Sequence, residues 1–274
     1  MASQSISNDA IARMRAPWEM GDFGAISREV GAPAAAEFAA ALDVRPGEKV
    51  LDVACGTGAV SIPLALRGAE LTGLDISKRL LAEARERAVD AGIRISLDEG
   101  LAEELPYPNA AYDWVVSMFG VMFSSQPNVT AAEMARVLRS GGGLCLGNWT
   151  RAGFSGRFPD LVAPFVSPPP PEAPSPYVWS DKATVVELLE PWFRDIETER
   201  VRIEWHLDLC PIEAARFFMR NSGQFVMLSS FLKPDRFSEL SEATEQLWIK
   251  ANQATDPGRT VIPNEYMKVS ATRC

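Results

Sequence analysis

Short apolar segments alternate with segments of helical spacing between residues 50 and 149. The strand-like segments are residues 50–54, 69–75, 93–97, 113–118 and 144–149. Helices are expected between them at residues 59–67, 77–91 and 130–138. An apolar run bounded by turn residues is typical of a strand buried on both faces of a parallel sheet, and its alternation with helices indicates βαβ units. The pattern predicts an α/β fold with a Rossmann-like, doubly wound sheet.

The segments on either side of this core are less regular. Residues 1–44 are predicted to form a helical cap. Nine of the 20 prolines fall between residues 159 and 191, and the run at 168–171 is either a rigid surface excursion or a linker. Beyond it we expect an alternating strand at 196–209, helices at 211–232 and 234–252, and a last strand at 260–273.

These segments together predict the whole architecture. It is a seven-stranded, mostly parallel sheet with an antiparallel last strand and a helical insertion before that strand. We expect one domain over residues 1–274, divided into a cap (1–44), a core (45–150) and a closing region (151–274).

Composition excludes several classes of protein. The chain has 47% hydrophobic and 23% charged residues, and its net charge is −9 without any cluster of Lys or Arg, which disfavours nucleic acid as a partner. There is no apolar run long enough to span a membrane and no signal-peptide core, so a cytoplasmic protein is expected. Four scattered cysteines and one histidine predict neither a disulfide framework nor a metal site. The oligomeric state stays open.

The strongest functional signal is the segment VLDVACGTG at residues 50–58. It predicts a strand that enters a glycine turn and then a helix. Gly56 and Gly58 allow positive φ and a close approach of a ligand, and the helix N-terminus offers free N–H groups. Asp75 ends the next strand, where a carboxylate can accept hydrogen bonds from ribose hydroxyls. A nucleoside ligand at the carboxyl ends of the strands is therefore predicted.

The same segment disfavours a nicotinamide-dependent oxidoreductase. The third glycine of the dinucleotide fingerprint is replaced by Ser61. Asp52 lies inside the first strand, where it suits a cation or ammonium group better than a pyrophosphate.

Five segments resemble the class I S-adenosylmethionine-dependent methyltransferases, especially the small-molecule branch that includes the ubiquinone/menaquinone C-methyltransferases. They are VLDVACGTG (50–58), LTGLDIS (71–77), EGLAEELPYP (99–108), YDWVVSMFGVMF (112–123) and EMARVLRSGGGLCLGNW (133–149). Their order and spacing are those of the family. The resemblance implies this fold and S-adenosylmethionine as the cofactor. It also implies that residues 45–150 are the cofactor-binding core and that the helical insertion is the substrate region.

The resemblance also implies roles for individual residues. Asp52 and the turn residues Gly56, Thr57 and Gly58 would line the methionine and ribose portions, and Asp75 would hold the ribose hydroxyls.

The remaining cofactor contacts that the resemblance implies concern the adenine and the sulfonium. Ile76 would pack on the adenine. Leu101 and Ala102 would flank the adenine edge, where the family usually has Asp-Ala, so Leu101 lacks the usual side-chain acceptor. Ser117 and Met118 would lie under the sulfonium. Trp18, in WEMGDF (18–23), either closes over the cofactor or caps the sheet.

The acceptor site is less defined by the sequence. Methyl transfer needs alignment and exclusion of water, and a general base only if the acceptor arrives protonated. His206, the only histidine, is the candidate base, but it shares the charged face of its strand with Glu204 and Asp208, which favours a solvent-facing structural residue instead. Phe and Met side chains at 217–231 form either an apolar acceptor pocket or core.

We therefore expect an enzyme of class EC 2.1.1.- that methylates a small, partly apolar acceptor at oxygen or carbon. The alternative is a non-catalytic S-adenosylmethionine-binding module that engages a partner protein.

Overall fold

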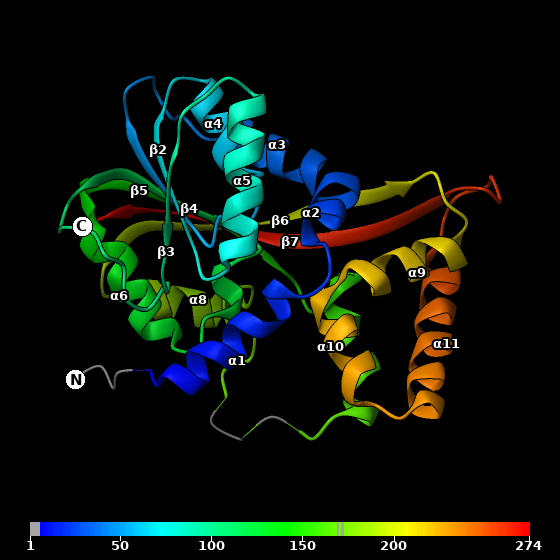
Figure 1. Ribbon diagram of the computed structural model, residues 1–274. Helices are drawn as coiled ribbons and strands as arrows, with labels where there is room; N and C mark the ends of the chain where they lie inside the picture. The colour runs from blue at the N-terminus through cyan, green and yellow to red at the C-terminus, as the bar shows by residue number, and fades with distance from the viewer. Residues whose placement is uncertain (1–5, 169, 171–172) are drawn as a thin grey trace. The chain divides into compact units, whose positions relative to one another are not determined.

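The computed structural model describes residues 6–168, 170 and 173–274 of the chain. Its centre is a seven-stranded sheet in the order β3-β2-β1-β4-β5-β7-β6 (Figure 1). The strands are β1 (Lys49–Val53), β2 (Glu70–Asp75), β3 (Ser96–Glu99), β4 (Tyr112–Met118), β5 (Leu138–Trp149), β6 (Phe193–Leu207) and β7 (Thr260–Arg273). The first five strands are parallel, and β7 pairs antiparallel with β5. The predicted fold class is confirmed.

The three helices predicted between the parallel strands are present close to the expected positions, as α4 (Ser61–Leu66), α5 (Lys78–Asp90) and α6 (Pro127–Val137). Helix α3 (Ala32–Ala40) lies in the predicted helical cap, and α8 (Lys182–Leu189) precedes β6. Ser77 is the N-cap of α5, because its Oγ accepts a hydrogen bond from the Leu80 N–H at 3.1 Å. Strand β3 begins later than predicted, since the Ile93 N–H still bonds to the Ala88 carbonyl at the end of α5.

The chain forms two compact units. Unit 1 comprises the described residues of Met1–Ala32, Arg151–Pro171 and Arg202–Glu265, and unit 2 those of Pro33–Thr150, Glu172–Val201 and Tyr266–Cys274. Strands β6 and β7 therefore contribute residues to both units. The predicted single domain with three parts stays a prediction.

Unit 2 contains the parallel strands and a large apolar core. Strands β4 and β5 pack through Val115, Leu144 and Leu146 against Met134 of α6 and against Trp179, which precedes α8. Trp179 and Leu144 have no exposed surface. Because burial of such side chains contributes about 1.5–3 kcal/mol each, this core fixes where the strands of unit 2 end.

Unit 1 is mostly helical. Its helices are α1 (Asn8–Glu19), α2 (Phe23–Ile26), α7 (Phe158–Val162), α9 (Pro211–Asn221), α10 (Gly223–Phe231) and α11 (Pro234–Ala251), with a π-helical segment, η1 (Ser27–Gly31). Short 3-10 segments occur in both units: η2 (Val121–Phe123) in unit 2, and η3 (Ser155–Arg157) and η4 (Ala163–Phe165) in unit 1. Among the residues that the structure describes, no helix has the length and apolarity needed to cross a membrane.

The predicted single helix over 211–232 is wrong, because the chain breaks it between α9 and α10. Ser222 forms an antiparallel bridge with Gly21, and the Asn221 carbonyl accepts a hydrogen bond from the Asp22 N–H at 2.7 Å. A Cβ on Gly223 would lie 1.7 Å from the Pro17 carbonyl oxygen, so only glycine permits this contact. The proline run at 168–171 lies partly outside the described residues.

Candidate functional site

The carboxyl ends of β1 and β2 bring two buried carboxylates together. Asp52 is 2% and Asp75 5% exposed. Asp52 accepts a hydrogen bond from Ser61 Oγ at 2.6 Å. Burial raises the pKa of Asp52 from 3.8 to about 7; the bond from Ser61 opposes the rise and the negative charge of Asp75 adds to it. A cation placed beside Asp52 would reverse this effect and favour the charged carboxylate.

Asp75 holds the glycine turn against the end of β2. One carboxylate oxygen accepts the Gly56 N–H at 2.8 Å and the other accepts the Ser77 N–H at 2.9 Å. Bonds of this kind are strong because the acceptor is charged. A carboxylate is an acceptor with about four lone-pair sites, which is the chemistry that hydroxyl groups of a ligand require.

The glycine turn itself leaves an open surface. Ala54, Gly56 and Gly58 have φ values of 57°, 54° and 77°. A Cβ built on Gly56 would meet nothing within 4 Å, whereas one on Gly58 would lie 3.4 Å from the Ile62 side chain. The backbone at Gly56 is therefore accessible to a ligand. Together with the two carboxylates, this surface fits a nucleoside that carries a cationic group.

Thr57 is oriented differently from its glycine neighbours. Its carbonyl and hydroxyl oxygens accept hydrogen bonds from Arg87 of α5 at 2.8 and 2.9 Å, and the residue is 4% exposed. These bonds tie the turn to α5. A direct cofactor contact of Thr57 stays a prediction.

A group of three aromatic rings follows at the carboxyl ends of β4 and β5. Phe119 stacks on Trp149 with ring centroids 3.6 Å apart, and Tyr266 lies edge-on to Phe119 at 5.6 Å. Phe119 and Trp149 remain partly exposed. We call these residues the aromatic edge. The sequence pattern did not single out Trp149 or Tyr266, although an aromatic residue at the end of a predicted strand was a usable signal for Trp149.

The backbone beside the aromatic edge is strained. Phe119 has a φ of 60°, and with Ala54 it accounts for two of the four positive-φ non-glycine residues in the described chain. Gly120, which follows Phe119, lies against Ala54: a Cβ built on Gly120 would be only 2.5 Å from the Ala54 Cβ, so the two backbone segments are in close contact. Backbone strain of this kind costs roughly 1–3 kcal/mol per residue and clusters at functional sites.

The other predicted cofactor residues of unit 2 lie along the same carboxyl ends. Ser117 is fully buried and its Oγ accepts the Val121 N–H at 3.2 Å, while Met118 ends β4. Gly100 donates its N–H to the Asp75 carbonyl at 3.0 Å, which brings Leu101 to the end of β2.

Three further positions complete this description of unit 2. Ile76 directly follows Asp75 and is partly exposed, whereas Ala102 packs against the apolar core. The adenine contacts of Ile76, Leu101 and Ala102 stay predictions.

Two predicted residues belong to unit 1. Trp18 lies on α1 and packs against Phe23, with ring centroids 4.9 Å apart. The side chain of His206 on β6 is 65% exposed, and its Nε2 lies 3.1 Å from a Glu204 carboxylate oxygen. Their roles as cofactor contact and base stay predictions.

The Phe- and Met-rich segment is also in unit 1. Met219, Phe225 and Leu228 are buried in an apolar cluster, and Phe218 stacks on Phe158 at 4.9 Å. Most of this segment therefore forms core, while Phe231 is 56% exposed.

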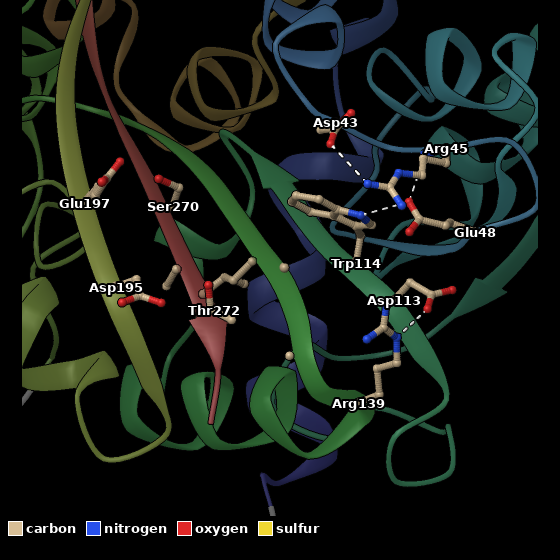
Figure 2. A pocket seen from close by; sticks show the side chains of 14 residues that line it. Asp43, Arg45, Glu48, Asp113, Trp114, Arg139, Asp195, Glu197, Ser270 and Thr272 are labelled. Carbon is tan, nitrogen blue, oxygen red and sulfur yellow. Dashed lines mark hydrogen bonds and ion pairs between the residues drawn. The ribbon is translucent and has the colours of Figure 1, made fainter.

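A cavity of about 480 Å³ lies away from these residues, where β1, β4 and β5 begin, at the opposite end of the parallel strands from the glycine turn (Figure 2). Its lining contains two ion pairs, Arg139 with Asp113 and Arg45 with Asp43. Within the described part of the chain, no group of three or more His, Cys, Asp or Glu side chains could hold a metal ion.

Comparison with known proteins agrees with this geometry. Residues 50–142 match the family model described as a methyltransferase domain. The chain is 37% identical to an uncharacterised protein of Mycobacterium tuberculosis over 209 residues, which cover 76% of each chain. It is 38% identical over 112 residues to the ubiquinone/menaquinone biosynthesis C-methyltransferase of Bordetella avium, covering 40% of this chain and 44% of that one.

A solved structure gives the same fold at low identity. The structure of a geranyl diphosphate methyltransferase in complex with S-adenosylmethionine matches with a TM-score of 0.53 and 15% identity, covering 99% of this chain and 93% of that chain. The phosphatidylethanolamine N-methyltransferase of Cereibacter sphaeroides is 36% identical over 144 residues, which cover 51% of this chain and 68% of that protein. The chain therefore belongs to the S-adenosylmethionine-dependent methyltransferases, and S-adenosylmethionine is its cofactor.

Proposed function

We propose that the protein transfers the methyl group of S-adenosylmethionine to a carbon or oxygen atom of a small, partly apolar acceptor. The observation that supports the acceptor class is the aromatic edge, in which Phe119 and Trp149 are partly exposed at the carboxyl ends of β4 and β5, the same end of the sheet as the glycine turn. Binding sites for small molecules are lined mostly by apolar and aromatic side chains with a few polar groups.

Four residues would hold the cofactor. Asp75 would accept the ribose hydroxyls with its remaining lone pairs, and Gly56 would lie against the ligand because nothing covers its Cα. Asp52 would face the cationic groups of the methionine portion, with Ser61 orienting its carboxylate. When bound, S-adenosylmethionine supplies an activated methyl group on a sulfonium with a good leaving group.

The protein contributes mainly position and desolvation. An aligned pair of reactants gains about 7–11 kcal/mol from prepaid translational and rotational entropy. The contact of Gly120 with Ala54 fixes the end of β4 against the glycine turn, so the aromatic edge has a defined position relative to Asp52 and Gly56. Apolar rings there would exclude water from the acceptor. Exclusion of water would favour the step in which a negative charge on the acceptor and the positive charge of the sulfonium neutralise each other.

Cofactor binding is tested first by calorimetric titration with S-adenosylhomocysteine, with NADH as the control ligand. We expect binding in the micromolar range for S-adenosylhomocysteine and none for NADH. The absence of S-adenosylhomocysteine binding would contradict the assignment of the cofactor residues.

The reaction is tested with S-adenosylmethionine labelled in its methyl group and mixtures of phenolic and other apolar acceptors. We expect label in an organic product together with stoichiometric S-adenosylhomocysteine. Phe119→Ala should lower this turnover at least about tenfold while leaving the affinity for S-adenosylhomocysteine within about twofold. If Phe119→Ala lost affinity for S-adenosylhomocysteine and turnover to the same extent, the aromatic edge would not be part of the acceptor site.

A further inference from the structure

Four buried polar side-chain atoms of unit 2 have no hydrogen-bond partner among the described residues. They are Ser124 Oγ, Thr130 Oγ1, Asn148 Oδ1 and Trp179 Nε1. Thr130, Asn148 and Trp179 have no exposed surface, and Ser124 is 8% exposed. In native proteins the large majority of such atoms are paired, and each unpaired one opposes folding. Four in one compact unit therefore require an explanation.

These four residues come from segments that lie at the carboxyl ends of the parallel strands. Ser124 and Thr130 belong to the connection that leaves β4 and enters α6, and Asn148 is the penultimate residue of β5. The amide of Asn148 donates to the Trp179 carbonyl at 3.4 Å, which joins the segment before α8 to the end of β5. Helix α6 contacts η2, β5 and α8, so it connects all four segments.

Asn148 also shares a sheet face with Ser117 of the cofactor region. Ser117 pairs with Leu146 in the parallel register of β4 and β5, and Asn148 is two residues further along β5. Residues two apart in a strand point to the same face. The unpartnered atoms thus belong to the same end of the sheet as the predicted position of the sulfonium.

The chemistry of the set specifies the missing group. The indole N–H of Trp179 can only donate, and Asn148 Oδ1 can only accept, whereas the hydroxyls of Ser124 and Thr130 do both. A hydroxyl is the smallest organic group that satisfies a donor and an acceptor together. An apolar acceptor without a hydroxyl would leave both atoms unpaired, and sites built to bind a hydroxyl reject analogues that lack it.

We infer that Asn148 and Trp179, with Ser124 and Thr130, recognise a hydroxyl group of the methyl acceptor and make the enzyme selective for hydroxyl-bearing apolar molecules. The inference rests on the proposed function, since it concerns the acceptor of that reaction. The competing explanation is a buried structural water, which would satisfy the same atoms without contributing selectivity.

Phenol and toluene distinguish these explanations, because they share a ring and differ only by hydroxyl against methyl. Each is titrated into the wild-type protein saturated with S-adenosylhomocysteine, and binding is followed by NMR. We expect phenol to bind at least about tenfold more tightly than toluene. Asn148→Leu and Trp179→Phe should each reduce this ratio to about twofold or less, with the affinity for S-adenosylhomocysteine unchanged.

A matched control is Thr244→Val in unit 1, since Thr244 is fully buried but its hydroxyl donates to the Leu240 carbonyl at 2.7 Å. It should leave the phenol-to-toluene ratio unchanged. Trp179→Phe keeps an aromatic side chain while removing the N–H donor, so it provides the test if Asn148→Leu fails to fold.

The inference would be overturned if the wild-type protein bound phenol and toluene with equal affinity, or if it did not bind phenol. It would also be overturned if Asn148→Leu and Trp179→Phe raised thermal stability and kept the phenol-to-toluene affinity ratio, because that is the result expected from removing a structural water site. Failure of S-adenosylhomocysteine itself to bind would instead refute the proposed function.

Discussion

Replacing Asp52 by asparagine should stabilise the protein above neutral pH while weakening cofactor binding. Asp52 is fully surrounded by protein and has the charge of Asp75 nearby, so the native state favours its protonated form. Asparagine has nearly the same shape and is neutral at every pH. Its side-chain oxygen can still accept the hydrogen bond from Ser61 that Asp52 accepts at 2.6 Å.

The magnitude follows from the pKa of Asp52, which burial raises from 3.8 to about 7. Between these two values the native state binds more protons than the unfolded state, so the contribution of Asp52 to the free energy of unfolding falls as the pH rises. At about 1.4 kcal/mol per pKa unit, the total loss is about 4 kcal/mol and is complete above pH of about 7. Asp52→Asn should therefore match the wild type near pH of about 4 and exceed it by about 4 kcal/mol at pH of about 8.

Urea unfolding followed by tryptophan fluorescence, at several pH values for both proteins, measures this difference. Comparing the two proteins removes the contribution of other carboxylates, such as Glu133. Burial raises the pKa of Glu133, but hydrogen bonds from Arg136 and the Leu105 N–H outweigh burial and hold this pKa below its ordinary value. A difference that is constant from pH of about 4 to about 8 would refute the reasoning, because Asp52 would then have the same pKa in both states.

The same variant should bind S-adenosylhomocysteine at least about tenfold more weakly, since the ammonium group of the ligand would lose a charged partner. In the wild type this affinity should rise with pH up to about 7, because binding favours the ionised carboxylate. Unchanged affinity in Asp52→Asn would place the ammonium elsewhere.

Three further substitutions test the site and the fold. Asp75→Asn should lower the affinity for S-adenosylhomocysteine at least about tenfold in calorimetric titration with the fold intact by circular dichroism; an unfolded variant would show that its bonds to backbone N–H groups are mainly structural. Gly56→Val should abolish binding of S-adenosylhomocysteine. Gly92→Val should incur the same backbone strain, because Gly92 has a φ of 68° and an equally open Cβ position, but it should leave this binding intact. Loss of binding in both variants would show that backbone strain alone is responsible. Gly223→Ala should lower the free energy of unfolding by about 1–3 kcal/mol, because its Cβ would overlap the Pro17 carbonyl, and an unchanged denaturation midpoint would contradict that contact.

Local signals in the sequence were sufficient for the sheet and for the glycine turn that ends β1. Strands buried on both faces need continuous apolar runs, and a turn that approaches a ligand needs glycine, so residues 50–58 and Asp75 carry their function in their own spacing. The N-cap at Ser77 is equally local, since it depends on a bond between residues three positions apart.

Tertiary contacts decided the features that no local pattern contains. The break at Ser222 depends on Gly21, which is about 200 residues away in the chain and pairs with it in the folded unit. The aromatic edge joins Phe119, Trp149 and Tyr266 because β5 lies between β4 and β7 in the sheet, an order that the sequence does not reveal.

The electrostatic properties of the site have the same origin. The sequence identifies Asp52 as a carboxylate in a strand, but only the surrounding structure raises its pKa, because the cost of burying a charge depends on everything packed around it. The unpartnered atoms of Asn148 and Trp179 also became visible only in the folded unit. Residue types and spacing thus determined the fold and its cofactor, while long-range packing decided which atoms are buried and which of them lack a hydrogen-bond partner.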